Sequence, residues 1–185
     1  CNMKLETKEV DQEGNLIVDG YIATTHLDSG FYDDERGLFV RDKISIDTLK
    51  EWANDINEGN PRANKVSVNH NRQPHVAGVG LKGTASVERL EDGEYGLRVK
   101  TLVDKTRDDF ESIKYRIDNG LLDSHSIEYS TKDAFTGNYI SNAVKEERVN
   151  GGVIRTLLPG TVLEGYTLAS QPMNEYAVMI KEAIE

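Results

Sequence analysis

The sequence predicts an α+β fold, in which two helices are inserted among many short strands of a mostly antiparallel sheet or small barrel. Three observations predict it. Short apolar segments recur along the chain and are separated by turn-forming residues. Only two segments show the apolar spacing of a helix. The 185 residues fit one domain with its own core. This combination is typical of all-antiparallel sheets with helices packed at one face or end.

The first helix is predicted over residues 47–57. Its apolar side chains recur on one stripe, at Leu49, Trp52, Ala53 and Ile56. Thr48 and Glu51 have the spacing of a capping box at the start of the helix. Gly59 stands where a left-handed residue would end it.

The second helix is predicted over residues 107–119, with Phe110, Ile113 and Ile117 on one side. Thr106 is a candidate N-cap, because its hydroxyl can accept a hydrogen bond from the first turn. Gly120 is placed for a left-handed C-terminal cap.

The strands are predicted from alternating apolar residues between turn signals. Asp19-Gly20 predicts a hairpin between 15–18 and 21–24, and residues 91–93 predict another between 84–90 and 96–103. Further strands are expected at 38–40, 65–70, 76–80, 124–131, 153–158, 161–170 and 176–180. In the strand 65–70, period two places Val66, Val68 and His70 on one face. The domain is expected to span 15–180, between an arm at 1–14 and a tail at 181–185.

Composition excludes several classes of function. With 22 Lys and Arg against 32 Asp and Glu, the net charge is −10. This charge argues against sequence-independent binding to nucleic acid and against an anionic membrane surface. The sequence has no apolar run long enough to span a bilayer. Cys1 is the only cysteine, so an internal disulfide is excluded and a reducing compartment is expected.

No cofactor or metal is expected. The sequence lacks the glycine-rich loops that cradle phosphates. His70 and His75 are the best candidate metal ligands, but Pro74 lies between them and no third ligand is evident.

His70 and Ser126 are the candidate catalytic residues. An imidazole at the end of a strand suits a general base near neutral pH, and a packed core-edge histidine is the alternative. Ser124, Ser126 and Glu128 share one face of the strand 124–131, where a serine could meet a histidine of a neighbouring strand. A solvated strand face is the alternative interpretation for these three residues.

Glu164 is the acidic residue most in need of a partner, because it lies in the otherwise apolar segment 161–169. An unpaired buried carboxylate is costly. Its partner could be a histidine that it orients or an arginine such as Arg155. Asp104 and Asp123, both at ends of elements, are further candidates.

Three segments together resemble the prohead (capsid maturation) proteases of tailed phages. Val68-Asn-His-Asn71, followed by Gln73-Pro74 and Gly78-Val79, resembles the family's apolar-Asn-His-Asp…Pro-x-Gly-x-Val region. Residues 117–129 resemble its Ile-x-x-Gly-x-Leu-x-Gly-Leu-Ser-Ile-Gly-Tyr segment. Residues 163–178 resemble its Leu-Glu-Val-Ser-Leu-Val-Thr-x-Pro-Ala-Asn-x-x-Ala segment. The resemblance covers roughly residues 15–180.

The resemblance implies a serine endopeptidase with the herpesvirus-protease-like fold, a small β-barrel surrounded by helices. His70 corresponds to the general base and Ser126 to the nucleophile, with Ser124 as the second choice. Glu164 matches a recurrent family Glu and is the candidate third member of a triad, with Asp104 as the fallback. Glu128 stands where the family usually has Gly, so it departs from the pattern beside the nucleophile.

The resemblance also implies partners and a location. Capsid scaffold protein and major capsid protein are the expected substrates, inside the procapsid in the host bacterial cytoplasm, and a homo-oligomer is possible. Some relatives cut after Glu in an apolar-x-Glu context, so self-cleavage after Glu182 in Ile180-Lys-Glu-Ala183 is expected. Two alternatives are a non-catalytic, scaffold-attached structural domain of the same fold, which Glu128 favours, and an unrelated acidic β-rich binding module.

Overall fold

The computed structural model describes residues 8–10, 13–131, 136, 143–170 and 179–180. In this part of the chain the protein has two helices, α1 (Ile46–Glu58) and α2 (Phe110–Asp118), and is otherwise built of strands. The strands are β1 (Lys8–Val10), β2 (Leu16–Thr24), β3 (Phe31–Asp33), β4 (Leu38–Ile44), β5 (Lys65–Val68), β6 (Gly78–Gly80), β7 (Ser86–Arg89), β8 (Tyr95–Val103), β9 (Ser124–Ser130), β10 (Val144–Val149), β11 (Gly152–Leu157), β12 (Val162–Ala169) and β13 (Met179–Ile180). The predicted α+β class is confirmed.

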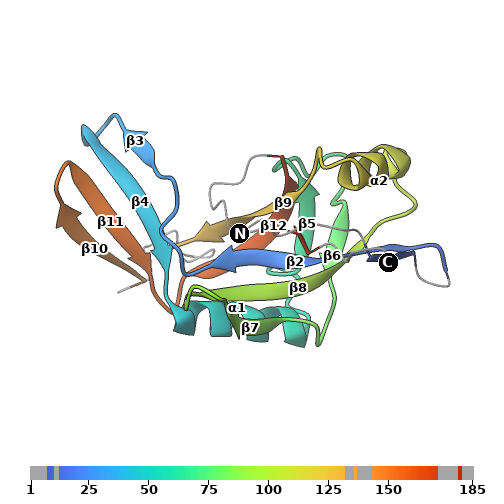
Figure 1. Ribbon diagram of the computed structural model, residues 1–185, viewed down its shortest axis with the longest axis horizontal. Helices are drawn as coiled ribbons and strands as arrows, with labels where there is room; N and C mark the ends of the chain where they lie inside the picture. Colours follow the sequence, from blue (N-terminus) through green and yellow to red (C-terminus); the bar gives the residue numbers. More distant parts are fainter. Residues whose placement is uncertain (1–7, 11–12, 132–135, 137–142, 171–178, 181–185) are drawn as a thin grey trace.

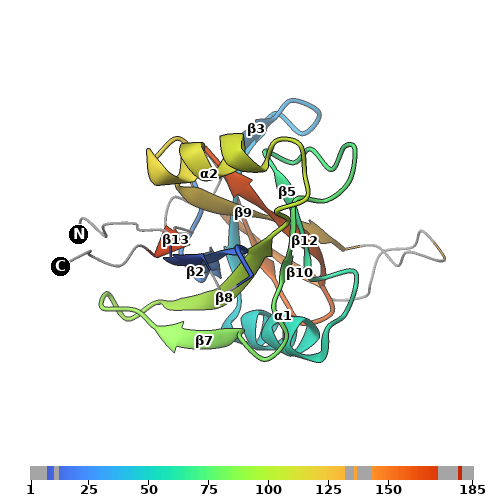
Figure 2. The ribbon, with the colours of Figure 1, turned by 90° about the vertical axis from the view of Figure 1, so that its right-hand side faces the viewer.

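The larger sheet is a strongly curled half-barrel. Its main path runs β1-β2-β8-β6-β5-β12-β9, while β13 pairs with β2 and β7 pairs with β8. All of these pairs are antiparallel except β12 with β5. The curl brings β9, the last strand of the path, back toward β2 (Figure 2). There the ring Nδ1 of His125 lies 3.1 Å from the carbonyl oxygen of Tyr21.

The smaller sheet, in the order β10-β11-β4-β3, stands at one end of the molecule (Figure 1). Its central pair, β11 with β4, is parallel, and the outer pairs are antiparallel. A side-chain contact joins the two sheets, because the Tyr129 hydroxyl on β9 donates a hydrogen bond to Asp42 on β4 over 2.8 Å. The site described below lies where the sheets meet.

The core fills the inside of the curled sheet and is closed by the helices. Leu49, Trp52 and Ile56 of α1 are fully buried, and the Trp52 indole N–H donates to the carbonyl of Thr161 over 2.8 Å. Tyr166, at the centre, hydrogen-bonds to Thr101 on β8. These contacts hold β12, which carries part of the site, against the core.

Both helices form where their apolar spacing predicts, but their N-caps differ. Ser45, not Thr48, caps α1, because its side chain accepts from the Thr48 N–H. Asp109, not Thr106, occupies the N-cap position of α2, and Thr106 instead hydrogen-bonds to Asp104. The predicted left-handed glycines are present, with φ of 77° at Gly59 and 71° at Gly120.

The predicted hairpin at Asp19-Gly20 is wrong, because both residues lie inside the continuous strand β2. Asp19 is only 5% exposed, and the Arg98 guanidinium on β8 binds its two carboxylate oxygens at 2.9 Å each. That partner neutralises an acid that would otherwise favour a turn. The second predicted hairpin is confirmed, because β7 and β8 are antiparallel partners from Ser86↔Arg98 to Arg89↔Tyr95.

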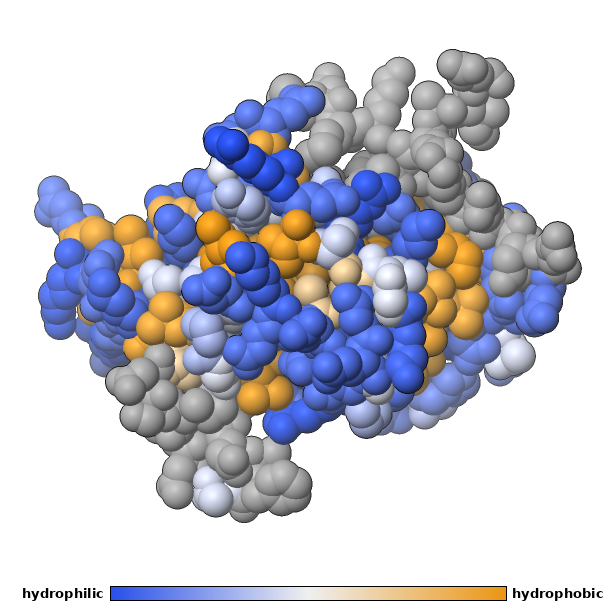
Figure 3. All heavy atoms as spheres, turned by 90° about the horizontal axis from the view of Figure 1, so that it is seen from below, coloured by the Kyte–Doolittle hydropathy of each residue, from blue (hydrophilic) through white to orange (hydrophobic). Residues whose placement is uncertain are grey.

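The surface on the side of α1 is mainly hydrophilic, with apolar residues in small patches (Figure 3). Within the described residues, no helix is long and apolar enough to cross a membrane.

Removing Arg98 should destabilise the protein strongly. In Arg98→Ala the buried Asp19 carboxylate loses its cation, and we expect a loss of about 3–5 kcal/mol of unfolding free energy in urea titrations. The double variant Asp19→Asn/Arg98→Met removes both charges and should recover much of that loss. If the double variant is as unstable as Arg98→Ala, the charge balance at Asp19 is not what stabilises this strand pair.

Candidate active site

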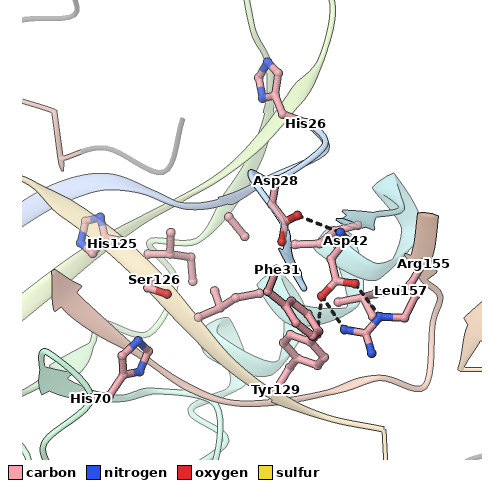
Figure 4. A pocket seen from close by; sticks show the side chains of 14 residues that line it. His26, Asp28, Phe31, Asp42, His70, His125, Ser126, Tyr129, Arg155 and Leu157 are labelled. Atoms are coloured by element: carbon pink, nitrogen blue, oxygen red, sulfur yellow. Dashed lines mark hydrogen bonds and ion pairs between the residues drawn. The ribbon is translucent and has the colours of Figure 1, made fainter. Parts of the chain in front are cut away.

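A pocket of about 350 Å³ lies between the two sheets. Its walls come from β2 and β9 of the curled sheet and from β3, β4 and β11 of the smaller sheet. In Figure 4, His70, His125 and Ser126 lie at one end, and Asp28, Asp42 and Arg155 lie at the other. The pocket therefore has one end with a hydroxyl and imidazoles and another end with carboxylates.

Ser126 lies near the middle of β9 and lines the pocket. Its cross-strand neighbour on β12 is Thr167, whose own neighbour on β5 is Ser67. Directly opposed residues on one sheet face have Cβ atoms about 5 Å apart. A row of three hydroxyl side chains thus crosses these strands, with Ser126 at the end that reaches the pocket.

His70 is held above this row by a tight turn rather than by a strand. Asn69 and His70 both have positive φ, 47° and 61°, and the Asn71 N–H donates to the carbonyl of Val68 over 2.9 Å. The predicted shared face of Val66, Val68 and His70 is therefore wrong, because two left-handed residues end the alternation after Val68. Strained conformations of this kind cluster at functional sites.

Thr167 fixes the position of this turn. Its hydroxyl accepts a hydrogen bond from the His70 backbone N–H over 3.0 Å. Because Thr167 is also the cross-strand neighbour of Ser126, the backbone of His70 sits one side chain away from the candidate nucleophile. The Val68–Asn71 turn thus places His70 on the side of the sheet that carries the Ser126 side chain.

Glu128 is the carboxylate that contacts His70. Its Oε1 lies 3.2 Å from His70 Nδ1 and accepts from the Ser67 hydroxyl over 3.2 Å, while Oε2 accepts from Arg72. The Glu128 side chain is 22% exposed, against 53% for His70. When Nδ1 donates to a carboxylate, the proton-free nitrogen of a neutral imidazole is Nε2, as a general base requires.

A β-bulge brings Arg72 to Glu128. Between β12 and β9, Leu163 pairs with Tyr129 and Gly165 with Glu128, so Glu164 is the extra residue. Gly165 has φ of 116°, and a Cβ there would lie 2.8 Å from Arg72 Nη2. The missing side chain lets Arg72 donate to both the Glu164 carbonyl and the Glu128 carboxylate.

Ser126 and His70 line the same pocket, but no hydrogen bond joins their side chains. Catalytic hydrogen bonds are often long in the absence of substrate and shorten in the reacting complex. The exposed His70 ring contacts Glu128 through Nδ1, so Nε2 is the ring nitrogen that this contact leaves unused.

The carboxylates named from sequence lie elsewhere. Glu164 pairs with Arg62, whose Nε donates to Oε2 over 2.7 Å, and not with His70 or Arg155. The carboxylate beside His70 is therefore Glu128 and not Glu164. Asp104, the fallback, faces His75 at 3.3 Å and binds Thr106, whose bonds lower the pKa of its carboxyl.

Ser124, the second-choice nucleophile, is 6% exposed and donates to Asp123 over 2.8 Å. Neither residue contacts His70. The next residue, His125, faces the core, where its ring packs edge-on against Tyr166. Burial lowers the pKa of His125 to about 4, so it is neutral at pH 7.

A second imidazole also lies between a hydroxyl and a carboxylate. His26 Nδ1 is 2.8 Å from the Thr24 hydroxyl and Nε2 is 2.6 Å from Asp92, whose pKa this contact lowers. Thr24, however, is fully buried, so its hydroxyl cannot meet a substrate. His70, which pairs with Glu128, lies at the same end of the pocket as Ser126 (Figure 4).

The other end of the pocket is acidic. Arg155 binds both oxygens of Asp42, through Nε at 2.7 Å and Nη2 at 2.9 Å. Asp28 accepts from the Asp42 backbone N–H over 2.8 Å. Burial, with the nearby Asp42, raises the pKa of Asp28, and burial also raises the pKa of Tyr129.

Among the residues that the structure describes, no three His, Cys, Asp or Glu side chains group to hold a metal ion. Comparisons of the chain with protein-family models, with curated proteins and with solved structures find no match.

Sequence reasoning missed Glu128 as a partner of His70, although the signal was present. Period two places Glu128 on the same strand face as Ser126, and this is the face where the His70 ring meets a carboxylate. Arg72, Thr167 and the acidic end of the pocket had no local signal, because distant strands bring them there.

The buried His125 should make stability depend on pH. Its pKa falls from 6.5 to about 4 on folding, so the unfolded chain binds a proton that the folded protein does not. Stability should be fully present above pH 6.5 and decline toward pH 4, by on the order of 3 kcal/mol. Urea unfolding of wild type and His125→Asn at pH 7 and pH 4.5 measures this. The stability difference between them should shrink at pH 4.5, and an unchanged difference contradicts it.

Proposed function

We propose that this protein is a serine endopeptidase in which Ser126 is the nucleophile, His70 the general base and Glu128 the carboxylate that orients His70. One observation carries the proposal: His70, which lines the same pocket as Ser126, has its Nδ1 3.2 Å from the carboxylate of Glu128. The sequence resemblance to phage prohead proteases supports the same two residues, His70 and Ser126, independently of this contact.

The chemistry is acyl transfer in two steps. His70 Nε2 takes the Ser126 proton while Oγ attacks the peptide carbonyl, and the resulting imidazolium is stabilised by Glu128. Collapse of the tetrahedral intermediate breaks the C–N bond, and the amine leaves with the proton from His70. Water, activated by the same imidazole, then hydrolyses the acyl-enzyme and restores Ser126.

The position of β9 supports a peptide as substrate. Among the described strands, β9 pairs only with β12, and the pocket runs beside its other edge. An extended peptide can add to such an edge and present a carbonyl to Ser126. The curled sheet is compatible with the herpesvirus-protease-like fold. That the sheet closes into the barrel of that fold is part of this proposal.

The biological setting is proposed from the sequence resemblance. The proposed substrates are capsid scaffold protein and major capsid protein, which the protein would cleave inside a procapsid in the cytoplasm of a host bacterium. A homo-oligomer is part of the same proposal.

A second candidate is a non-catalytic domain of the same fold that binds a peptide in this pocket. The lack of a hydrogen bond between Ser126 and His70 favours it, as does the contact that holds His70 Nδ1 on Glu128. Reactivity of Ser126 separates the two candidates.

Labelling with a fluorophosphonate tests the triad. Wild type should be labelled at Ser126, and Ser126→Ala or His70→Ala should not. Glu128→Gln should slow labelling by about 10²–10⁴-fold, because the imidazole loses its orienting charge. Labelling rates by intact-protein mass spectrometry give the comparison.

Glu164→Gln is the matched control, because it makes the same change in a carboxylate that binds Arg62. Its labelling rate should stay within about threefold of wild type. Labelling that survives the loss of His70, or that depends on Glu164 instead of Glu128, contradicts the proposed triad. Absence of labelling in wild type supports the binding domain.

Self-cleavage after Glu182 falls outside the described residues and stays a prediction from the sequence. Incubated wild-type protein should lose the three residues after Glu182, and Ser126→Ala should keep them. Intact mass gives the answer directly. Identical masses for the two proteins after long incubation show that Ser126 does not process this end.

A further inference from the structure

The acidic end of the pocket has more negative than positive charge. Asp42 is neutralised by Arg155, which binds both of its oxygens. Asp28, beside it, forms no ion pair with a described residue. Its carboxylate accepts a hydrogen bond from the backbone N–H of Asp42. Burial and the neighbouring Asp42 raise the pKa of Asp28, whereas a cation placed beside this carboxyl would favour its charged form.

Among the described residues that line the pocket, no other ionisable group offers a spare positive charge. His26 is held between Thr24 and Asp92, and His70 is held by Glu128. His125 is neutral, and its Nε2 has no hydrogen-bond partner within the described chain although the ring is fully buried. The pocket therefore presents acceptors and a net negative charge to anything that enters it.

Apolar side chains form much of the rest of the pocket wall. They are Ile22, Ala23, Phe31, Ile44, Ile127 and Leu157. The volume of about 350 Å³ is at the lower end of the range for small-molecule sites, which is about 300–1,000 Å³. Ser126 and Asp28 lie at opposite ends in Figure 4, so a side chain entering beside Ser126 would cross apolar wall before it met the carboxylate.

We infer that this pocket binds a long basic side chain of the substrate, Lys or Arg, on the acyl side of the bond that Ser126 attacks. The methylene stem packs on the apolar wall and the charged head reaches Asp28. The inference rests on the proposed function for the position of the scissile bond. It differs from the preference for Glu implied by the sequence resemblance, because a carboxylate here would face Asp28 with no free cation.

Binding to catalytically inactive Ser126→Ala protein tests the pocket without requiring cleavage. Three peptides, acetyl-Ala-Ala-X-Ala-Ala-amide with X as Lys, norleucine or Glu, share one length and differ at one side chain. Calorimetric titration should show the Lys peptide binding at least about tenfold more tightly than norleucine, and the Glu peptide binding most weakly. Equal affinities, tightest binding of Glu or no binding of the Lys peptide overturns the inference.

The charge of Asp28 is then tested directly. In Ser126→Ala/Asp28→Asn the ratio of Lys to norleucine affinity should fall to within about twofold of one. Ser126→Ala/Asp34→Asn, with the same charge change in the exposed β3–β4 turn, should keep the ratio. If the ratio survives in Asp28→Asn, Asp28 is not the acceptor and the inference is wrong.

Two further readouts separate the possible failures. If Asp28→Asn is unfolded by circular dichroism, the salt dependence of Lys-peptide binding to Ser126→Ala replaces it. The ratio of Lys to norleucine affinity should decline when NaCl is raised from about 50 to about 500 mM, because salt screens an ionic contact. A ratio that does not depend on salt overturns the inference. Preferential binding of the Lys peptide to Ser126→Ala, without cleavage by wild type, refutes the proposed function and leaves the basic-side-chain pocket standing.

Discussion

The candidate site depends on how β12 pairs with β9, and in particular on the bulge at Glu164–Gly165. The extra residue exposes the Glu164 carbonyl, and the absence of a side chain at Gly165 makes room for Arg72. Arg72 fixes one oxygen of Glu128, and the other oxygen is left to Ser67 and His70. A side chain at position 165 would place its Cβ 2.8 Å from Arg72 Nη2, so Glu128 would lose the guanidinium that holds it.

Accessibility distinguishes this site from the similar groups around it. Three of the four histidines have a carboxylate partner, namely His26 with Asp92, His70 with Glu128 and His75 with Asp104. The hydroxyl beside His26 belongs to Thr24, which is fully buried. Asp104, the partner of His75, accepts a hydrogen bond from the Thr106 hydroxyl. Charge pairing alone is therefore common on this acidic protein. The combination of a paired imidazole, a serine on a strand face and an open pocket is what points to chemistry.

Local sequence determines much of this fold, and contacts across the chain determine the rest. Helix α1 and the β7–β8 hairpin were predictable because apolar spacing and turn residues act over a few positions. The strand through Asp19 was not, because Arg98 lies 79 residues away. In the site, period two placed Ser126 and Glu128 together. The partner of Glu164 could not be read from sequence, because Arg62 lies 102 residues away.

The most direct test of the triad is a crystal structure of the protein after reaction with a fluorophosphonate. A working triad predicts phosphorus bonded to Ser126 Oγ, His70 Nδ1 within hydrogen-bond distance of Glu128, and Nε2 turned toward the adduct. An unmodified Ser126, or an adduct with His70 rotated away from Glu128 while another carboxylate holds it, would contradict the account.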